Sequence, residues 1–246
     1  MSPRRRALRP ARPRRLARLA ALGLSAGVAV AVLSTVLALL WLREGPLPRS
    51  AFMRVARRAD PATGQPCAEI DYRWVDRAAL SPHLRLAVVL AEDQKFLVHR
   101  GFDLDSLRKA WREHRRGGRT RGASTISQQL ARNLFLWPDP SLLRKGLEAW
   151  ITLWIETLWT KQRILEAYLN VAQFGPCLFG AEAAAARFFG RPAADLRPEQ
   201  AALLAAVLPS PARWSARSPG PYAQERARKI LALMGQLRSA PHLHGL

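Results

Sequence analysis

Cysteine is scarce in this sequence. The 246 residues contain only Cys67 and Cys177, and neither belongs to a Cys-x-x-Cys pair. This excludes a cysteine-based zinc motif and a disulfide framework as the basis of the fold. Pairing of the two cysteines in an oxidising compartment is the less favoured alternative. The fold is therefore expected to rest on an apolar core, which a hydrophobic content of 49% allows.

Acidic residues are also few, with 18 Asp and Glu against 39 Lys and Arg, so the net charge is +21. Residues 1–18 hold eight Arg and no acid, and the remaining 31 basic and 18 acidic residues still carry +13. An anionic partner is therefore expected. Neither a zinc motif nor aromatic-bearing strands are visible, so nucleic acid is the weaker alternative and is not predicted as a partner.

Charge is absent altogether from residues 19–42. These 24 residues would form a helix about 36 Å long, enough to cross a hydrocarbon core of about 30 Å. The alternative, a cleaved signal peptide, would have a shorter apolar region and a small-residue cleavage site, and none is evident before Arg43. We therefore predict a transmembrane helix over 19–42. The basic tail, 1–18, should stay cytoplasmic, which places residues 43–246 across the membrane.

The rest of the chain has room for one domain, not for two catalytic domains. Residues 43–68 are rich in Pro and Gly without a sustained period, and are expected to form a linker or irregular connector. We assign 69–237 to a domain and 238–246 to a tail. Helical patterns dominate the domain, with strand-like alternation limited to residues 69–75, so we predict a mainly α fold.

The first informative helix should begin at Ser81-Pro82, an N-cap followed by proline, and end at Gly101. Glu92 falls on the apolar side of this helix, together with His99. Burial would raise the pKa of this carboxylate toward the range of a general base. The alternative is a structural acid paired with His99 or with an Arg from elsewhere.

Several segments follow this helix. Residues 103–121 are basic and flexible in pattern, suited either to a solvated loop or to anionic lipid headgroups. A further helix is expected after Gly122, with Thr125 and Gln128 forming a capping box. The next should start at Asp139-Pro140 and carry Arg144 and Glu148 on one face as an ion pair. Three short helices are predicted over 161–170, 174–190 and 196–209.

Five ordered segments together resemble glycosyltransferase family 51, specifically the monofunctional biosynthetic peptidoglycan transglycosylases of Gram-negative bacteria. The similarity covers about residues 70–215. The matching segments are Glu92–Gly101, Gly122–Asn133, Arg144–Glu148, Lys161–Asn170 and Phe174–Gly190.

This resemblance implies a two-lobed, lysozyme-like glycosyltransferase domain behind a single N-terminal transmembrane helix, with the active-site cleft between the lobes. It implies polymerisation of lipid II into β-1,4-linked glycan strands by inverting transfer, with release of undecaprenyl diphosphate and without a transpeptidase domain. Glu92 would be the general base that deprotonates the acceptor 4-hydroxyl. Glu148 would be the second catalytic carboxylate, near the leaving diphosphate of the donor.

The resemblance also implies a set of substrate-binding residues, among which Arg132, Arg144 and Lys145 would hold the diphosphate. The full set is Asp93, Phe96, His99, Ser124, Thr125, Gln128, Gln129, Arg132, Arg144, Lys145, Lys161, Arg163 and Asn170. No cofactor and no resident metal are expected, although a divalent cation such as Mg²⁺ could accompany the lipid diphosphate. Expected partners are lipid II, the growing lipid-linked glycan strand, the bacterial inner membrane, and cell-division or wall-synthesis proteins. The catalytic domain would be periplasmic.

Three features depart from the family pattern. Arg132 stands where many relatives have Lys, and Pro140 stands where they often have a basic residue. The usual acidic and glycine residues around Phe174-Gly175 are replaced by Gln173, Pro176 and Cys177. These changes bear on substrate binding more than on the reaction class.

Two other classes of protein remain open on the residues alone. A membrane-bound glycoside hydrolase or lytic enzyme could use the same fold with two carboxylates, although the cations around Glu148 argue against it. A non-catalytic basic membrane scaffold would have no use for Glu92 on an apolar face.

Overall fold

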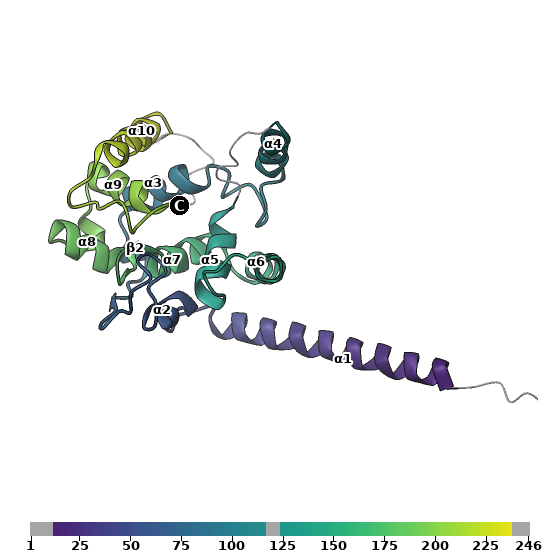
Figure 1. Ribbon diagram of the computed structural model, residues 1–246. Coiled ribbons are helices and arrows are strands. Elements are labelled where there is room, and N and C mark those ends of the chain that lie inside the picture. The colour runs from purple at the N-terminus through teal and green to yellow at the C-terminus, as the bar shows by residue number, and fades with distance from the viewer. Residues whose placement is uncertain (1–11, 117–123, 238–246) are drawn as a thin grey trace, which may run out of the picture.

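The computed structural model describes residues 12–116 and 124–237, and it is mainly helical, as predicted (Figure 1). A division into two lobes remains an expectation. In chain order the elements are α1 (Arg12–Trp41), α2 (Ala51–Ala56), β1 (Asp71–Tyr72), η1 (Arg77–Ala79), α3 (Pro82–Glu92), α4 (Leu104–Arg115), α5 (Ile126–Phe135), α6 (Leu142–Leu158), α7 (Lys161–Val171), β2 (Gln173–Gly175), β3 (Leu178–Phe179), α8 (Ala181–Phe189), η2 (Ala193–Asp195), α9 (Pro198–Val207) and α10 (Pro221–Leu237).

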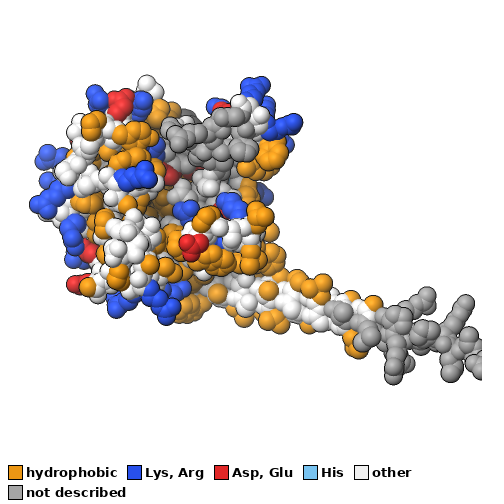
Figure 2. Space-filling model, in the orientation of Figure 1, with side chains coloured by type: hydrophobic (Ala, Val, Ile, Leu, Met, Phe, Trp, Pro, Cys, Tyr) orange, Lys and Arg blue, Asp and Glu red, His pale blue; other side chains and the backbone are white. Residues whose placement is uncertain are grey.

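Helix α1 projects from the rest of the molecule, and hydrophobic side chains cover the part of it that is described (Figures 1 and 2). Residues Ala17–Trp41 are long and apolar enough to cross a membrane, with a mean hydropathy of 2.2. This agrees with one membrane-spanning helix at the N-terminus. Most of the predicted cytoplasmic tail lies outside the described residues, as does the tail 238–246.

The carboxyl-terminal end of α1 is packed into the domain, mainly against α6. Leu39 and Leu42 are buried. The Trp159 indole donates to the Leu39 carbonyl at 2.8 Å, and Arg163 donates to the carbonyls of Leu42 and Gly45 at 2.8 and 2.7 Å. The anchor helix and the domain therefore share buried contacts.

The segment 43–68 is not the irregular linker that its composition suggested. It contains α2, which Ser50 caps by accepting a hydrogen bond from the Met53 amide, and the side chains of Phe52 and Met53 are buried. A short apolar run between two proline-rich pieces is enough to form a helix when α5 covers it. The segment therefore forms part of the folded body, and the predicted boundary at residue 69 falls inside packed structure.

The two cysteines form a disulfide, which corrects the expectation that they stay unpaired. Cys67 and Cys177 lie 110 residues apart in sequence, with their Cα atoms 5.7 Å apart. The buried Asp60 carboxylate lies beside them and accepts hydrogen bonds from the Cys177 amide and the Gln173 side chain. Sequence spacing cannot reveal this contact, because it depends on how the segment 43–68 folds back onto the β2–β3 turn.

Local signals placed most helix starts correctly and several ends incorrectly. Ser81 caps α3 as predicted, but α3 ends at Glu92 and not at Gly101. The Asp93 backbone leaves the helical conformation, and its carboxylate bonds to the start of α5. Helix α6 starts at Leu142 with Ser141 as its cap, not at Asp139. The range 174–190, expected to be one helix, contains the hairpin β2–β3 followed by the helix α8. The hairpin forms a small sheet with β1, in the order β1-β3-β2.

The basic segment 103–121 is largely the helix α4, in its described part. Asp103 accepts hydrogen bonds from the amides of Asp105 and Ser106, which is an N-cap that the composition concealed. Leu107 and Trp111 are exposed on α4. Figure 2 shows Lys and Arg side chains beside hydrophobic ones over the region of this helix. Contact of this segment with anionic lipid headgroups stays one of the two alternatives predicted for it.

The core lies where two groups of helices meet. Helix α3 packs against α9 and α10, and α5 packs against α6 and α7. The largest fully buried side chains include Tyr168, Phe96 and Phe174. Because Glu92 ends α3, it lies at the junction between these two groups.

We expect the double variant Cys67→Ser/Cys177→Ser to have a free energy of unfolding lower by about 2–5 kcal/mol, because the disulfide closes a long loop of the unfolded chain. Denaturant unfolding of the detergent-solubilised protein measures the change. Wild-type protein treated with a reductant should match the double variant, and an unfolding midpoint insensitive to both changes would contradict the cross-link.

Candidate active site

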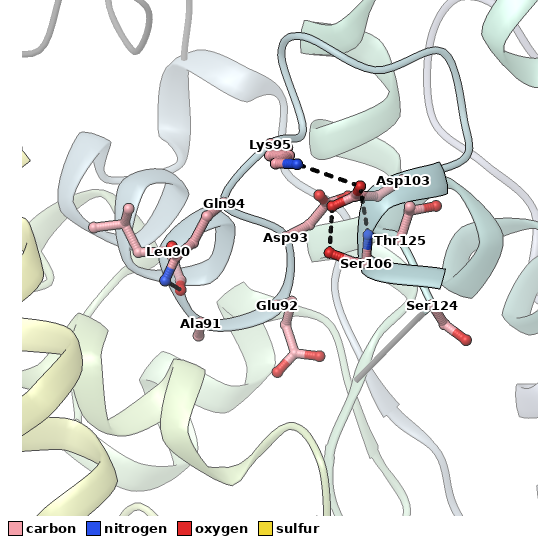
Figure 3. A pocket seen from close by; sticks show the side chains of 10 residues that line it. All are labelled: Leu90, Ala91, Glu92, Asp93, Gln94, Lys95, Asp103, Ser106, Ser124 and Thr125. Atoms are coloured by element: carbon pink, nitrogen blue, oxygen red, sulfur yellow. Dashed lines mark hydrogen bonds and ion pairs between the residues drawn. The ribbon is translucent and has the colours of Figure 1, made fainter. Parts of the chain in front are cut away.

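Glu92 is held at the end of α3 by two donors from other helices. The Gln129 side-chain amide of α5 donates to Glu92 Oε2 at 3.0 Å, and Arg226 of α10 donates to Oε1 at 3.0 Å. The Glu92 side chain is 11% exposed and points into a cavity of about 260 Å³ (Figure 3). Residues 90–95 form one wall of this cavity, and Ser124 and Thr125 lie on another.

Burial raises the pKa of Glu92 above its ordinary value. The Gln129 hydrogen bond and the charges of Arg226 and Arg132 oppose that rise. The structure therefore agrees with both alternatives that the sequence left open for Glu92. The residue is a buried acid paired with an Arg, and it is also a carboxylate with a raised pKa that faces a cavity. Of the two partners named in that alternative, an Arg from elsewhere is the one found, whereas His99 bonds to Asp93.

Gln129 connects Glu92 to a second cavity. The Tyr168 hydroxyl of α7 donates to Gln129 Oε1 at 2.9 Å, which orients the amide so that its nitrogen faces Glu92. Burial, with the nearby Glu92 charge as the next cause, raises the pKa of Tyr168 well above its ordinary value. A cavity of about 390 Å³ lies on this side, lined in part by Arg132 and Arg213. Gln129 thus bonds to Glu92 and also lines this second cavity together with the two arginines.

Asp93 and His99 join α3 to α5. The Gly101 amide donates to His99 Nδ1 at 3.0 Å, so the neutral ring carries its proton on Nε2, which donates to Asp93 Oδ2 at 2.9 Å. Asp93 Oδ2 also accepts from the Ile126 amide at 3.0 Å, and the Thr125 hydroxyl donates to the Gly101 carbonyl. These bonds occupy Asp93 and His99 within the protein, although Asp93 also lines the cavity.

Glu148 is buried between two cations of its own helix. Arg144 Nη1 donates to Glu148 Oε2 at 2.7 Å, and Lys145 bonds to the other oxygen, which confirms the predicted ion pair on α6. Arg144 is buried and also donates to the Asp139 carbonyl, whereas the Lys145 side chain is 47% exposed. Lys145 is the member of this group that is accessible to a ligand.

Arg132 lies on α5 close to Glu92. Its guanidinium lies 5.7 Å from the centre of the Phe52 ring and lines the larger cavity. The cations proposed for the diphosphate are thus at two places, with Arg132 beside the Glu92 network and Arg144 and Lys145 around Glu148.

Six of the predicted binding residues make contacts within the protein, and one of them, Thr125, also lines the smaller cavity. Phe96 is fully buried, and the predicted capping box between Thr125 and Gln128 is present. Lys161 pairs with Glu156 and lies over the Phe96 ring. The remaining two, both buried, are Arg163, which bonds to the end of α1, and Asn170, which bonds to both backbone groups of Val75.

Among the described residues, the Glu92 and Glu148 carboxylates offer no oxygen free of hydrogen bonds to a resident Mg²⁺. That ion prefers free carboxylate and carbonyl oxygens. A cluster of Asp60 with Cys67 and Cys177 has the geometry of a metal site, but its two sulfurs are joined to each other. We therefore derive no step through a metal.

The sequence model of the transglycosylase family matches residues 63–235. The chain belongs to the transglycosylase family. It is 46% identical to a biosynthetic peptidoglycan transglycosylase of Aeromonas hydrophila, over 94% of this chain and 95% of that protein. Proteins of the same name from Rhodospirillum centenum and Pseudomonas aeruginosa are 49% and 50% identical, over 92% and 82% of this chain and 93% and 87% of their own length.

Three further residues of the candidate site were not predicted from the sequence. Arg226 contacts Glu92, and Tyr168 contacts Gln129. Arg213 lines the larger of the two cavities. Tyr168 falls inside a segment that resembles the family, so its motif offered a signal. Arg226 and Arg213 are two among many Arg residues, and nothing in their local pattern distinguishes them.

We expect Asp93→Asn to lower the free energy of unfolding by about 1–3 kcal/mol, because an amide nitrogen would face the donors of His99 and Ile126 in a buried place. Chemical denaturation measures the effect. Asp105→Asn is the matched control, since the Asp105 side chain is 74% exposed and its ion pair with Lys95 lies on the surface. Equal stability of the two variants would contradict the structural role of Asp93.

Proposed function

We propose that this transglycosylase is a peptidoglycan glycosyltransferase that polymerises lipid II into β-1,4-linked glycan strands by inverting transfer. The names of its relatives support the activity. The observation that carries the mechanism is the position of Glu92, a buried carboxylate with a raised pKa at the wall of one cavity and one amide away from a second.

Glu92 acts as the general base in this proposal. It takes the proton of the acceptor 4-hydroxyl while that oxygen forms its bond to the anomeric carbon of the donor. The bond between the anomeric carbon and the diphosphate breaks at the same time, on the opposite face, so the configuration inverts. Gln129 keeps the carboxylate aimed, since Tyr168 fixes the amide from the other side.

The departing diphosphate carries its own negative charge and needs cations more than it needs a proton. Arg132, which lines a cavity, and Lys145, which is half-exposed, are the candidates to bind the diphosphate. Arg144 is buried and holds the Glu148 carboxylate, which also bonds to Lys145. Fixed positive charge stabilises the transition state because it is in place before the charge develops. Glu148 then orients the cations and does not act as an acid.

We also propose that α1 anchors the protein in the bacterial inner membrane, with the N-terminus in the cytoplasm and the domain in the periplasm. The apolar stretch of α1 and the Arg residues before it support this orientation. The disulfide supports it independently, because such bonds persist in oxidising compartments such as the periplasm.

We expect Glu92→Gln to reduce polymerisation about 10²- to 10⁴-fold without unfolding the protein, because the amide keeps the size of the carboxylate but cannot take a proton. The assay follows the glycan polymer formed from lipid II by the full-length protein in detergent. Glu199→Gln, an exposed change on α9, is the control and should keep full activity.

The products decide between the reaction classes. Polymer that depends on Glu92 supports the proposal, whereas a Glu92 variant with more than half of the wild-type rate removes the residue from the mechanism. Release of fragments from preformed glycan, without polymer from lipid II, would instead indicate a hydrolase or lytic enzyme.

We expect Lys145→Ala to weaken binding of lipid II by about 1.5–3 kcal/mol, the cost of losing a charge-assisted contact. Lys145 is preferred to Arg144 for this test because Arg144 is buried and its removal would disturb folding. Lys229→Ala, with a 73% exposed side chain on α10, is the matched control. An unchanged KM for lipid II in Lys145→Ala would show that the diphosphate is bound elsewhere.

A further inference from the structure

Arg226 joins the C-terminal helix to the end of α3. One nitrogen of its guanidinium, Nη2, donates to the Ala91 carbonyl at 3.0 Å and to Glu92 Oε1 at 3.0 Å. The two acceptors are consecutive residues in the last turn of α3, where carbonyl groups lack partners within the helix. Arg226 therefore fixes both the backbone before Glu92 and one oxygen of its carboxylate.

The packing of α10 sets the position of this arginine. Ala223, Ala227, Ile230 and Met234 form the buried face of the helix, at a spacing of three and four residues, and α10 packs on α9 and α3. Arg226 lies at the edge of this buried face, with 27% of its side chain exposed. Its place beside Glu92 therefore follows from the core and not from a mobile surface side chain.

The charged and polar groups around Glu92 come from three other helices, α5, α7 and α10, and from the residue that follows α3. Gln129 and Arg132 lie on α5, Tyr168 lies on α7, and Asp93 follows Glu92 directly. Among the described residues, Arg226 is the cation in ion-pair contact with Glu92. Arg132 acts on Glu92 only through its charge, and it ranks after Arg226 among the causes that lower the pKa.

We propose that Arg226 is a positioning residue for the transfer reaction, which holds the Glu92 carboxylate ionised and aimed at the cavity despite its burial. This inference rests on the proposed function of Glu92. A buried carboxylate without a cation would take up a proton near neutral pH and would then be unable to accept one from the acceptor hydroxyl. Arg226 would thus set the lower pH limit of the activity without touching the substrate.

The test is the pH dependence of kcat/KM for polymerisation of lipid II by the full-length protein in detergent. Arg226→Gln removes the charge and keeps a hydrogen-bond donor, so the acidic limb of the profile should move to higher pH by about half a unit or more. On the acidic side this displacement corresponds to at least about a threefold loss of kcat/KM. At alkaline pH the variant should come within about twofold of wild type.

Two further variants separate charge from packing. Arg226→Lys keeps the positive charge and should return the acidic limb toward its wild-type position. Arg228→Gln makes the same change on an exposed part of α10, where the arginine pairs with Glu225, and should leave the profile unchanged.

The inference is overturned if Arg226→Gln lowers kcat/KM equally at every pH, or if Arg226→Lys shows the same displacement as Arg226→Gln. A purely structural role of Arg226 would lower kcat/KM equally at every pH. A contact of Arg226 with the substrate would also lower kcat/KM equally at every pH, by raising KM. If Arg226→Gln does not fold, Arg226→Lys decides, since a displaced limb in that variant also contradicts the proposal. Activity of Glu92→Gln would refute the proposed function itself, whereas an inactive Glu92→Gln together with an unmoved limb refutes only the role of Arg226.

Discussion

The Asp93 carboxylate joins the end of one helix to the first turn of another, and the geometry of the site depends on this contact. Asp93 directly follows the last residue of α3, Glu92, and by accepting from the Ile126 amide and from His99 it holds the first turn of α5 against that end. Gln129 follows one turn later on α5 and therefore reaches Glu92. A helix that continued to Gly101 would have carried Glu92 along its side, away from the start of α5.

Three buried glutamate side chains in this protein are paired with arginine or lysine. Glu92 has Arg226, Glu148 has two cations of its own helix, and Glu156 has Lys161. Such pairs add little net stability, because desolvation offsets most of the attraction, but loss of one partner leaves an uncompensated charge. The Arg excess of the composition therefore has two uses, one at the surface and one beside buried carboxylates.

Short-range chemistry in the sequence predicted much of this structure. The Ser81 cap, the box formed by Thr125 and Gln128, and the pair of Arg144 with Glu148 each depend on residues two to four positions apart. What escaped prediction depends on long-range contacts. Arg226 meets Glu92 across 134 positions, and Cys67 meets Cys177 across 110, so no local period distinguishes these residues from others of their type. The resemblance to a family located Glu92 and Glu148, but it did not identify the side chains that surround them.

The carboxyl-terminal end of α1 is built into the domain, because Trp159 bonds to the Leu39 carbonyl, Arg163 bonds to the carbonyl of Leu42 just after the helix, and Leu39 lies in the core. A flexible tether would let a domain sweep over a hemisphere above its attachment point. In this protein α1 is fixed to the domain by these contacts, so the cavities beside Glu92 keep one distance and one orientation relative to α1. With α1 in a bilayer, a lipid-borne substrate would have to reach them by lateral diffusion, and the glycan product would leave along a fixed direction.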